Sequence, residues 1–411
     1  MKNPQIQFFS SSEGWNISSY NEIGENFKYG LSVPAIPFDG ENKYLRITDI
    51  DDDTRIFDKT NLSSPGIDLS LANEYILTEG DITFARTGAS VGKSYLYDAK
   101  DGKIYFAGFL IKIGIKKNVC ASFIFQNSLT NNFKRYINLV SQRSGQPGIN
   151  IKELQAYKLY IPKTLEEQQK IASYFQSLDS LIQVTSKKLA SLKQIKAASL
   201  QSMFPQEGET VPKVRFKGFE GEWEKIQLNK CLDISNNINI HNTYGINDVL
   251  SISDEAGVVN QIEFLGRSFA GKSLQKYKIL KTDQLVYTKS PLKAKPYGII
   301  KKNFNRTGIV STLYAIYDCK DNVSPKFIHY YFDPCYRINQ YLSPLVNKGA
   351  KNTMNISDET ALSGEIWIPS LQEQQKIASY FCNLDKQISL QTQRLEKLKQ
   401  IKAACLDKMF V

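Results

Sequence analysis

Two long stretches of the chain, Leu165–Phe204 and Leu371–Phe410, place apolar or small residues in alternating steps of four and three, the spacing of a coiled-coil seam. Neither stretch contains glycine or proline, so each predicts one continuous helix of about 50–60 Å. Such a helix cannot bury its stripe against one small domain, and the other stretch is its natural partner. We therefore predict two antiparallel coiled-coil helices, although ordinary bundle helices would show the same pattern. The seam positions are Ile171, Phe175, Leu178, Ile182, Thr185, Leu189 and Leu192, and then Ile377, Phe381, Leu384, Ile388, Gln391, Leu395 and Leu398.

The two predicted helices are copies of each other. The sequence EQQKIASYF begins at Glu167 and recurs 206 residues later, and about 24 of the 40 aligned positions are identical. A fainter repeat precedes them, because Pro4–Phe8 leading to Trp15 resembles Pro212–Phe216 leading to Trp223. The chain is therefore an internal repeat with pseudo-two-fold character. Since the helices are alike and the upstream parts differ, we expect the helices to meet one kind of partner and the upstream parts to meet different ones.

The parts upstream of the helices have the pattern of mixed α/β domains. Short runs with strand character are Tyr44–Thr48, Asp81–Arg86, Val249–Ser253 and Gln284–Thr288. The predicted fold class is therefore α+β, with two mixed α/β domains separated by two long antiparallel helices. We call residues 1–160 the first body and 213–366 the second body. Residues 161–205 and 367–411 are the helical tails, and 206–212 is a polar linker containing Pro and Gly.

Composition narrows the class of protein only a little. Hydrophobic residues make up 42% of the 411 residues and the net charge is +11, which fits a nucleic-acid-binding protein and equally a basic protein without that role. The six cysteines form no CxxC pair and there are only two histidines, so we expect no metal site and reduced thiols. We find no apolar run long enough to span a membrane and no export signal in Met1–Ser10, so we expect a cytoplasmic protein.

Polar loops follow the predicted strands and one predicted helix in each body. They combine basic, amide and hydroxyl side chains with glycine, although ordinary solvated loops have a similar composition. Arg and Lys pair with guanine, Asn and Gln pair with adenine, and all four can contact phosphates. The candidate DNA-binding residues are Arg86, Thr87, Lys93, Arg143 and Gln146 in the first body and Lys289, Ser290, Lys293, Lys295, Lys348, Lys351 and Asn352 in the second.

Three patterns resemble catalytic or ligand-binding motifs, and each is incomplete. Gly88–Ser94 has three residues between its glycines, where a phosphate-binding loop has four. Asp333–Tyr336 resembles the Asp-Pro-Pro-Tyr motif of amino-methylating DNA methyltransferases, with Cys335 in place of the second proline. The acidic run Asp49–Asp53 is more typical of a solvated turn than of a divalent-cation site. We therefore predict no catalytic residues, no cofactor and no metal in this chain.

Taken together, three features resemble the specificity subunit of Type I restriction–modification systems over nearly the whole chain. They are the duplicated tails that follow Ile-Pro, the approaches to Trp15 and Trp223, and Gly80–Gly88 with the sequence GDITFARTG. The second body departs from the Gly-Asp-Ile pattern at Thr282–Ser290, TDQLVYTKS, which leaves the loop correspondence between the bodies open.

The resemblance implies a function, partners and contact residues. Each body would read one half of a split double-stranded DNA target, and the tails would contact two methyltransferase subunits, which restriction subunits can join. The chain itself would be a non-catalytic adaptor without S-adenosylmethionine or ATP. Two alternatives are a catalytic DNA methyltransferase or nuclease using Asp333 or the acidic run, and a coiled-coil scaffold without a nucleic-acid role. The expected partner contacts in the tails are Gln168, Gln169, Tyr174, Gln374, Gln375 and Tyr380.

Overall fold

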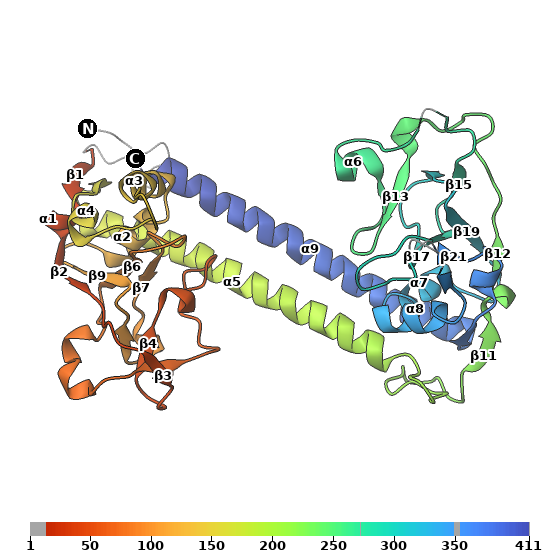
Figure 1. The fold of residues 1–411 in the computed structure, drawn as a ribbon, viewed down its shortest axis with the longest axis horizontal. Helices are drawn as coiled ribbons and strands as arrows, with labels where there is room; N and C mark the ends of the chain where they lie inside the picture. Colours follow the sequence, from red (N-terminus) through yellow and green to blue (C-terminus); the bar gives the residue numbers. More distant parts are fainter. Residues whose placement is uncertain (1–13, 272, 349–353, 411) are drawn as a thin grey trace. The chain divides into compact units, whose positions relative to one another are not determined.

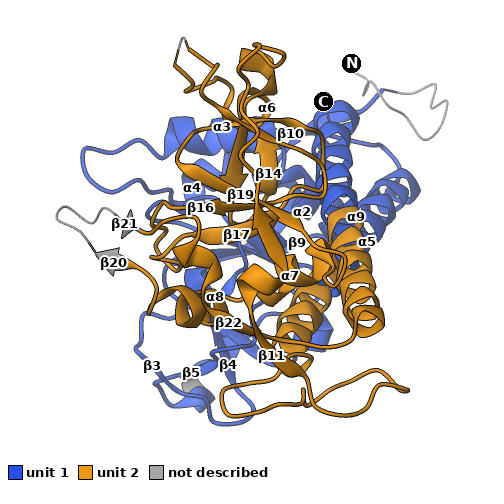
Figure 2. Cartoon of the chain, turned by 90° about the vertical axis from the view of Figure 1, so that its right-hand side faces the viewer, with its two compact units in different colours: residues 1–188, 391–411 blue, residues 189–390 orange. Residues whose placement is uncertain are grey.

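The computed structural model describes residues 14–271, 273–348 and 354–410 (Figure 1). The chain forms two compact units, residues 1–188 with 391–411 and residues 189–390, which Figure 2 shows in two colours. Each unit therefore contains one body together with parts of both tails. Pro4–Phe8, on which the fainter repeat partly depends, lies outside the described residues.

Unit 1 is built around a four-stranded antiparallel sheet in the order β2-β9-β6-β7, with β1 and β10 paired separately. One face of the sheet buries Phe84 and Ile111 against Phe123 of α2 and Phe133 of α3. The bounds are β1 (Asn16–Ser19), α1 (Tyr20–Ile23), β2 (Gly24–Tyr29), β3 (Ala35–Pro37), β4 (Lys43–Leu45), β5 (Ser63–Pro65), β6 (Asp81–Ala85), β7 (Ser94–Leu96), β8 (Ile104–Phe106), β9 (Leu110–Ile115), α2 (Ala121–Asn127), α3 (Asn131–Val140), α4 (Ile151–Gln155) and β10 (Lys158–Ile161).

Unit 2 repeats this plan with a sheet in the order β12-β19-β16-β17 and a separate pair of β11 with β22. Tyr287 and Ala315 of the sheet are buried with Phe327 of α7 and Ile338 of α8. The bounds are β11 (Glu224–Gln227), β12 (Leu232–Ile234), β13 (Leu250–Ser253), β14 (Gly257–Asn260), α6 (Gln261–Leu265), β15 (Lys278–Leu280), β16 (Leu285–Thr288), β17 (Ile299–Lys302), β18 (Gly308–Val310), β19 (Tyr314–Cys319), α7 (Pro325–Tyr331), α8 (Cys335–Leu342), β20 (Asn347–Lys348), β21 (Met354–Asn355) and β22 (Glu365–Ile368).

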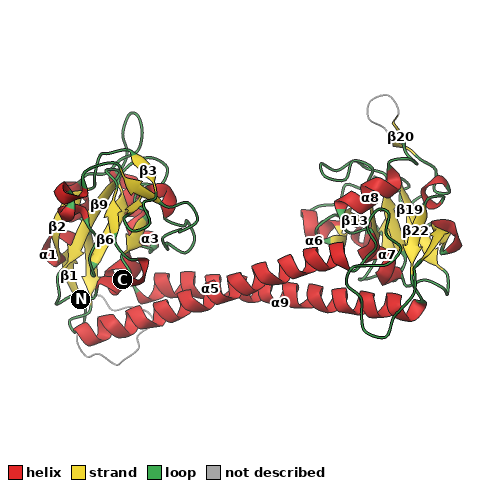
Figure 3. Cartoon of the chain, turned by 90° about the horizontal axis from the view of Figure 1, so that it is seen from below, coloured by secondary structure: helices red, strands yellow, loops and turns green. Residues whose placement is uncertain are grey.

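The two tails are the continuous helices α5 (Leu165–Ser202) and α9 (Leu371–Met409), drawn in red in Figure 3. The hydroxyl groups of Thr164 and Ser370 accept hydrogen bonds from backbone N–H groups in the first turn of α5 and α9, so both helices begin in the same way. The buried seam positions are Ile171, Phe175, Leu178, Ile182, Thr185, Leu192, Ile377, Phe381 and Leu384. The predicted α+β fold with two long coiled-coil helices and an internal repeat is confirmed.

In each unit the end of one helix packs against the start of the other, so the helices run antiparallel. In unit 1 the ring of Phe410 lies 5.0 Å from that of Phe123 and 5.7 Å from that of Phe175, between ring centroids. In unit 2 Phe204 lies 5.6 Å from Phe327 and 6.0 Å from a second phenylalanine, Phe381. The last aromatic residue of each tail therefore completes the core beneath the other tail.

Two local expectations need adjustment. The strand expected at Tyr44–Thr48 is the shorter β4, because the carboxylate of Asp49 accepts hydrogen bonds from the backbone and side chain of Arg46 and holds a turn there. The loop expected after α8 begins and ends in the short paired strands β20 and β21.

Candidate nucleic-acid interface

In unit 1 the loop after β6 lies beside the loop before α4. Thr87 forms a β-bridge with Gly148, and the backbone N–H of Ile149 donates to the carbonyl of Arg86 at 2.8 Å. The side-chain amide of Gln146 lies next to the same loop, at Gly88. Three of the predicted DNA-binding residues, Arg86, Thr87 and Gln146, are thus brought together.

The guanidinium of Arg86 is positioned by an aromatic ring. Its central carbon lies 4.7 Å from the ring centre of Tyr29 at the end of β2. Its Nε is buried and has no hydrogen-bond partner among the described residues. A stacked guanidinium is already oriented for a planar acceptor such as guanine, since stacking restricts its rotation.

The other two predicted residues of the first body are engaged within the protein. Arg143 is exposed, but its guanidinium donates to the carbonyls of Val140 and Gln142 and pairs with Glu153. Lys93 is 7% exposed, and its ammonium lies 2.6 Å from the exposed carboxylate of Asp52. Both would have to change partners to contact DNA, so their role stays a prediction.

In unit 2 the residue after β16 is Lys289, and it bridges to the segment after β21. Its ammonium lies 2.6 Å from Asp358 and donates to the carbonyl of Ile356 at 2.8 Å. Burial alone would raise the pKa of Asp358, but the hydrogen bonds from Lys289 and Lys278 outweigh burial, so the pKa of Asp358 lies below its usual value. This carboxylate is therefore ionised and fixes the start of the loop.

The remaining residues predicted in the second body divide into three groups. Ser290 and Lys293 are exposed on the loop between β16 and β17. Lys348 belongs to β20, but its side chain, like Lys351 and Asn352 as a whole, lies outside the described residues. Lys295 is 4% exposed and points inward.

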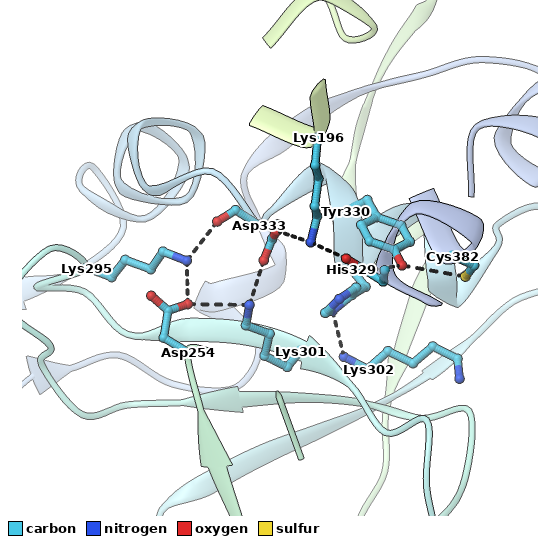
Figure 4. A network of polar contacts seen from close by, with 10 residues as sticks. Lys196, Asp254, Lys295, Lys301, Lys302, His329, Tyr330, Asp333 and Cys382 are labelled. Carbon is cyan, nitrogen blue, oxygen red and sulfur yellow. Dashed lines mark hydrogen bonds and ion pairs between the residues drawn. The ribbon is translucent and has the colours of Figure 1, made fainter. Parts of the chain in front are cut away.

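Lys295 belongs to a network of charges beneath the loop (Figure 4). Its ammonium lies 2.6 Å from the carboxylate of Asp254 and donates to the carbonyl of Asp333 at 2.7 Å. The carboxylate of Asp333 pairs with Lys301 at 2.7 Å and with Lys196 of α5 at 3.4 Å. The network therefore joins the loop, the sheet and the tail within unit 2.

This network bears on the methyltransferase alternative. Burial alone would raise the pKa of Asp333, but Lys301 and Lys196 outweigh it and hold that pKa well below its usual range. The Asp333–Tyr336 sequence lies across the junction of α7 and α8. Its carboxylate is occupied by structural ion pairs.

Carboxylates of the acidic run Asp49–Asp53 form separate ion pairs. Asp52 pairs with Lys93 and Asp53 pairs with Lys399, so these two carboxylates serve separate contacts. In the part of the chain that the structure describes, no group of His, Cys, Asp or Glu is arranged to hold a metal ion, and no helix is long and apolar enough to cross a membrane.

The predicted partner contacts in the tails fall into equivalent pairs. Gln168 is 3% exposed, and its side-chain amide bonds to the backbone of Cys120 and Pro162. Gln374 is 1% exposed and makes the equivalent bonds to the backbone of the second body and of Pro369. These two amides tie the start of each helix to its body.

The other predicted partner contacts differ in exposure. The half-buried tyrosines bond to the other tail, Tyr174 to Cys405 and Tyr380 to Ser199. Gln169 and Gln375 are exposed.

Sequence reasoning missed three residues at the loop ends of the sheets. Tyr29 lies under Arg86, and the large apolar side chains of Phe109 and Leu313 are exposed directly before β9 and β19. The only sequence signal for Phe109 and Leu313 is a large apolar residue beside Gly or Thr in a turn. This signal does not indicate a binding residue until the pairing of the strands is known.

The two bodies have the same sheet order but dissimilar polar loops, and each is attached to one of two near-identical helices. This architecture is that of a recognition protein with two different target-binding surfaces and two equivalent surfaces for one kind of partner. The chain belongs to the family of Type I restriction modification DNA specificity domains, whose model matches residues 12–194 and 268–400. The resemblance seen in the sequence is confirmed, and DNA target recognition is the function of this family.

Individual relatives agree. The chain is 22% identical over 422 residues to the putative type I restriction enzyme MjaX specificity subunit of Methanocaldococcus jannaschii, covering 96% of this chain and 92% of that protein. The crystal structure of the Type I restriction–modification S subunit from M. genitalium has the same fold, with a TM-score of 0.65 at 11% identity over 100% of this chain and 99% of that one.

Proposed function

We propose that this chain is the non-catalytic DNA-reading subunit of a Type I restriction–modification complex, in which each body reads one half of a split target. One observation carries the proposal. The sheets of the two bodies share one strand order, yet their loop ends carry different side chains, Arg86 and Thr87 in one and Lys289 and Ser290 in the other. A common scaffold with different polar ends is what two different half-sites require.

The tails are the proposed attachment sites for two methyltransferase subunits, with restriction subunits joining the same complex. The support is their near identity and the exposure of Gln169 and Gln375 at equivalent positions. Methyl transfer and ATP-driven steps would belong to the partners, and the proposed location is the cytoplasm. The internal ion pairs of Asp333 argue against catalysis by this chain.

The test is methylation and DNA binding by the complex of this chain with its methyltransferase subunits. The motif methylated by the natural complex is determined first, and Arg86→Ala and Lys289→Ala are then compared on duplexes with single base-pair changes. Each variant should lose about 1–3 kcal/mol of discrimination at one base pair if it reads a base. Lys158→Ala, on the exposed side of β10, is the matched control.

Arg86→Ala should affect one half-site and Lys289→Ala the other. A complex in which neither substitution alters affinity or discrimination would show that the reading surface lies elsewhere. A complex that methylates DNA without sequence preference would contradict the proposed function itself.

A further inference from the structure

Equivalent turns lead into the central strands β9 and β19. In unit 1 the turn spans Ala107–Leu110, with the N–H of Leu110 donating to the carbonyl of Ala107 at 2.9 Å. In unit 2 it spans Ser311–Tyr314, closed in the same way at 3.1 Å. The third residue of each turn is large and apolar. Phe109 is 61% exposed and Leu313 is 70% exposed.

Each exposed apolar residue lies beside the cation at the end of the neighbouring strand. In unit 1 Ala85 pairs with Leu110, so Arg86 follows opposite Phe109, and the N–H of Arg86 donates to the carbonyl of Phe109 at 2.9 Å. Because strand side chains alternate, Arg86, two residues after Phe84, continues the helix-covered face of the sheet, and Phe109 is the residue opposite it.

The same relation holds in unit 2 although the sequences differ. Thr288 pairs with Tyr314, so Lys289 and Leu313 are the next residues on the two strands. Both bodies therefore place a cationic residue and a large apolar residue opposite each other at the ends of two paired strands, as Arg and Phe in one body and as Lys and Leu in the other.

A single exposed apolar residue on a protein surface needs no explanation. Two exposed apolar residues at the same structural position in divergent bodies do need an explanation, because the third position of a turn ordinarily favours polar residues or glycine. The guanidinium of Arg86, whose Nε has no hydrogen-bond partner among the described residues, indicates an anionic polymer as the occupant, whereas Lys289 is paired with Asp358 and would have to exchange that partner. The apolar group that duplex DNA offers to a protein is the 5-methyl group of thymine in the major groove.

We infer that Phe109 and Leu313 are specificity residues, each packing on a thymine methyl group in its own half-site beside Arg86 or Lys289. The inference rests on the proposed function and extends it to the chemistry of one contact per half-site. Arg86 holds guanine or phosphate directly, Lys289 does so after exchanging its contacts with Asp358 and Ile356, and each apolar side chain excludes water from the adjoining thymine.

The experiment uses the complex with methyltransferase subunits and duplexes that carry the motif methylated by the natural complex. Phe109→Ala and Leu313→Ala are compared with Ile17→Ala and Ile240→Ala, whose side chains are 60% and 57% exposed elsewhere on the two units. Each test variant should lose about tenfold in affinity for the motif, the loss expected for one base contact. Binding to non-specific DNA, the salt dependence and the control variants should be unchanged, since no phosphate contact is removed.

Replacing thymines one at a time by uracil removes only the methyl group. One position in each half-site should weaken binding by the natural complex and leave the corresponding Ala variant unaffected. Uracil effects that are absent, or equally large in the variants, overturn the inference, as does an equal loss on specific and non-specific DNA. If the natural complex itself does not distinguish the motif from other DNA, the proposed function fails before this contact is tested.

Discussion

Phe410→Ala removes the aromatic ring with which the end of α9 completes the core of unit 1. The ring is 5% exposed and lies 5.0 Å from Phe123 and 5.7 Å from Phe175. Phenylalanine-to-alanine changes at buried sites cost about 3–5 kcal/mol, against about 5–15 kcal/mol for a whole domain. We expect a loss of about 3 kcal/mol confined to unit 1, because Phe410 lies at the end of a helix and its site can partly collapse.

The repeat supplies a matched variant and two reporters. Phe204→Ala removes the equivalent ring from unit 2. Trp15 lies 5.8 Å from Phe123 in unit 1, and Trp223 lies 6.1 Å from Phe204 in unit 2, between ring centroids. With Trp367 and one of these two replaced by phenylalanine, the fluorescence of the remaining tryptophan follows a single unit during urea unfolding.

The Trp15 protein should unfold at lower urea with Phe410→Ala and be unchanged with Phe204→Ala, and the Trp223 protein should respond in the opposite way. The antiparallel arrangement is refuted if Phe410→Ala acts on Trp223 alone. Equal shifts at both reporters would show that the units do not unfold separately, and hydrogen exchange would then locate the loss.

Three further outcomes follow from unit 2. Asp333→Asn removes the nearer carboxylate from the buried ammonium of Lys301 and leaves only the ion pair with Asp254 at 3.4 Å, so it should cost about 2 kcal/mol of unfolding free energy. Because the folded-state pKa of Asp333 is lowered, its contribution to stability is present above about pH 4 and is lost as the pH falls through the lowered pKa. Urea unfolding at a series of pH values measures this loss. Burial, with Lys301 nearby, lowers the pKa of His329 to about 3. Unfolding frees the imidazole to bind a proton, so the free energy of unfolding should fall as the pH drops below about 6.5. His329→Asn should flatten that decline, and an unchanged pH profile of unfolding would contradict the assignment. Lys295→Met should alter reading of the second half-site, with the first half-site as internal control, and methylome sequencing should show the change.

The helices and the repeat could be predicted because their signals are local and redundant. Leu165–Phe204 keeps its apolar seam over forty residues without a helix breaker, and the second tail has the same pattern. The strands β6 and β16 were predictable for the same reason, since alternation needs only a few adjacent residues.

Much of the site depends on contacts between residues that are distant in the sequence. Lys295 and Lys293 look alike in one loop, yet only Lys295 meets Asp254 and the carbonyl of Asp333, so one is buried and the other exposed. Gln168 and Gln169 are likewise adjacent, and the helix period turns only the first toward its body. Nothing local distinguishes them before the fold brings their partners together.

The central claim is that the two bodies read their half-sites independently, and exchange of one body tests it most directly. The second body, residues 213–366, is replaced by the corresponding body of a relative, and the complex is expressed with its methyltransferase subunits for methylome sequencing. One half of the methylated motif should change to the half read by the relative's body while the other half stays the same. A motif in which both halves change, or neither does, would contradict independent reading by the two bodies.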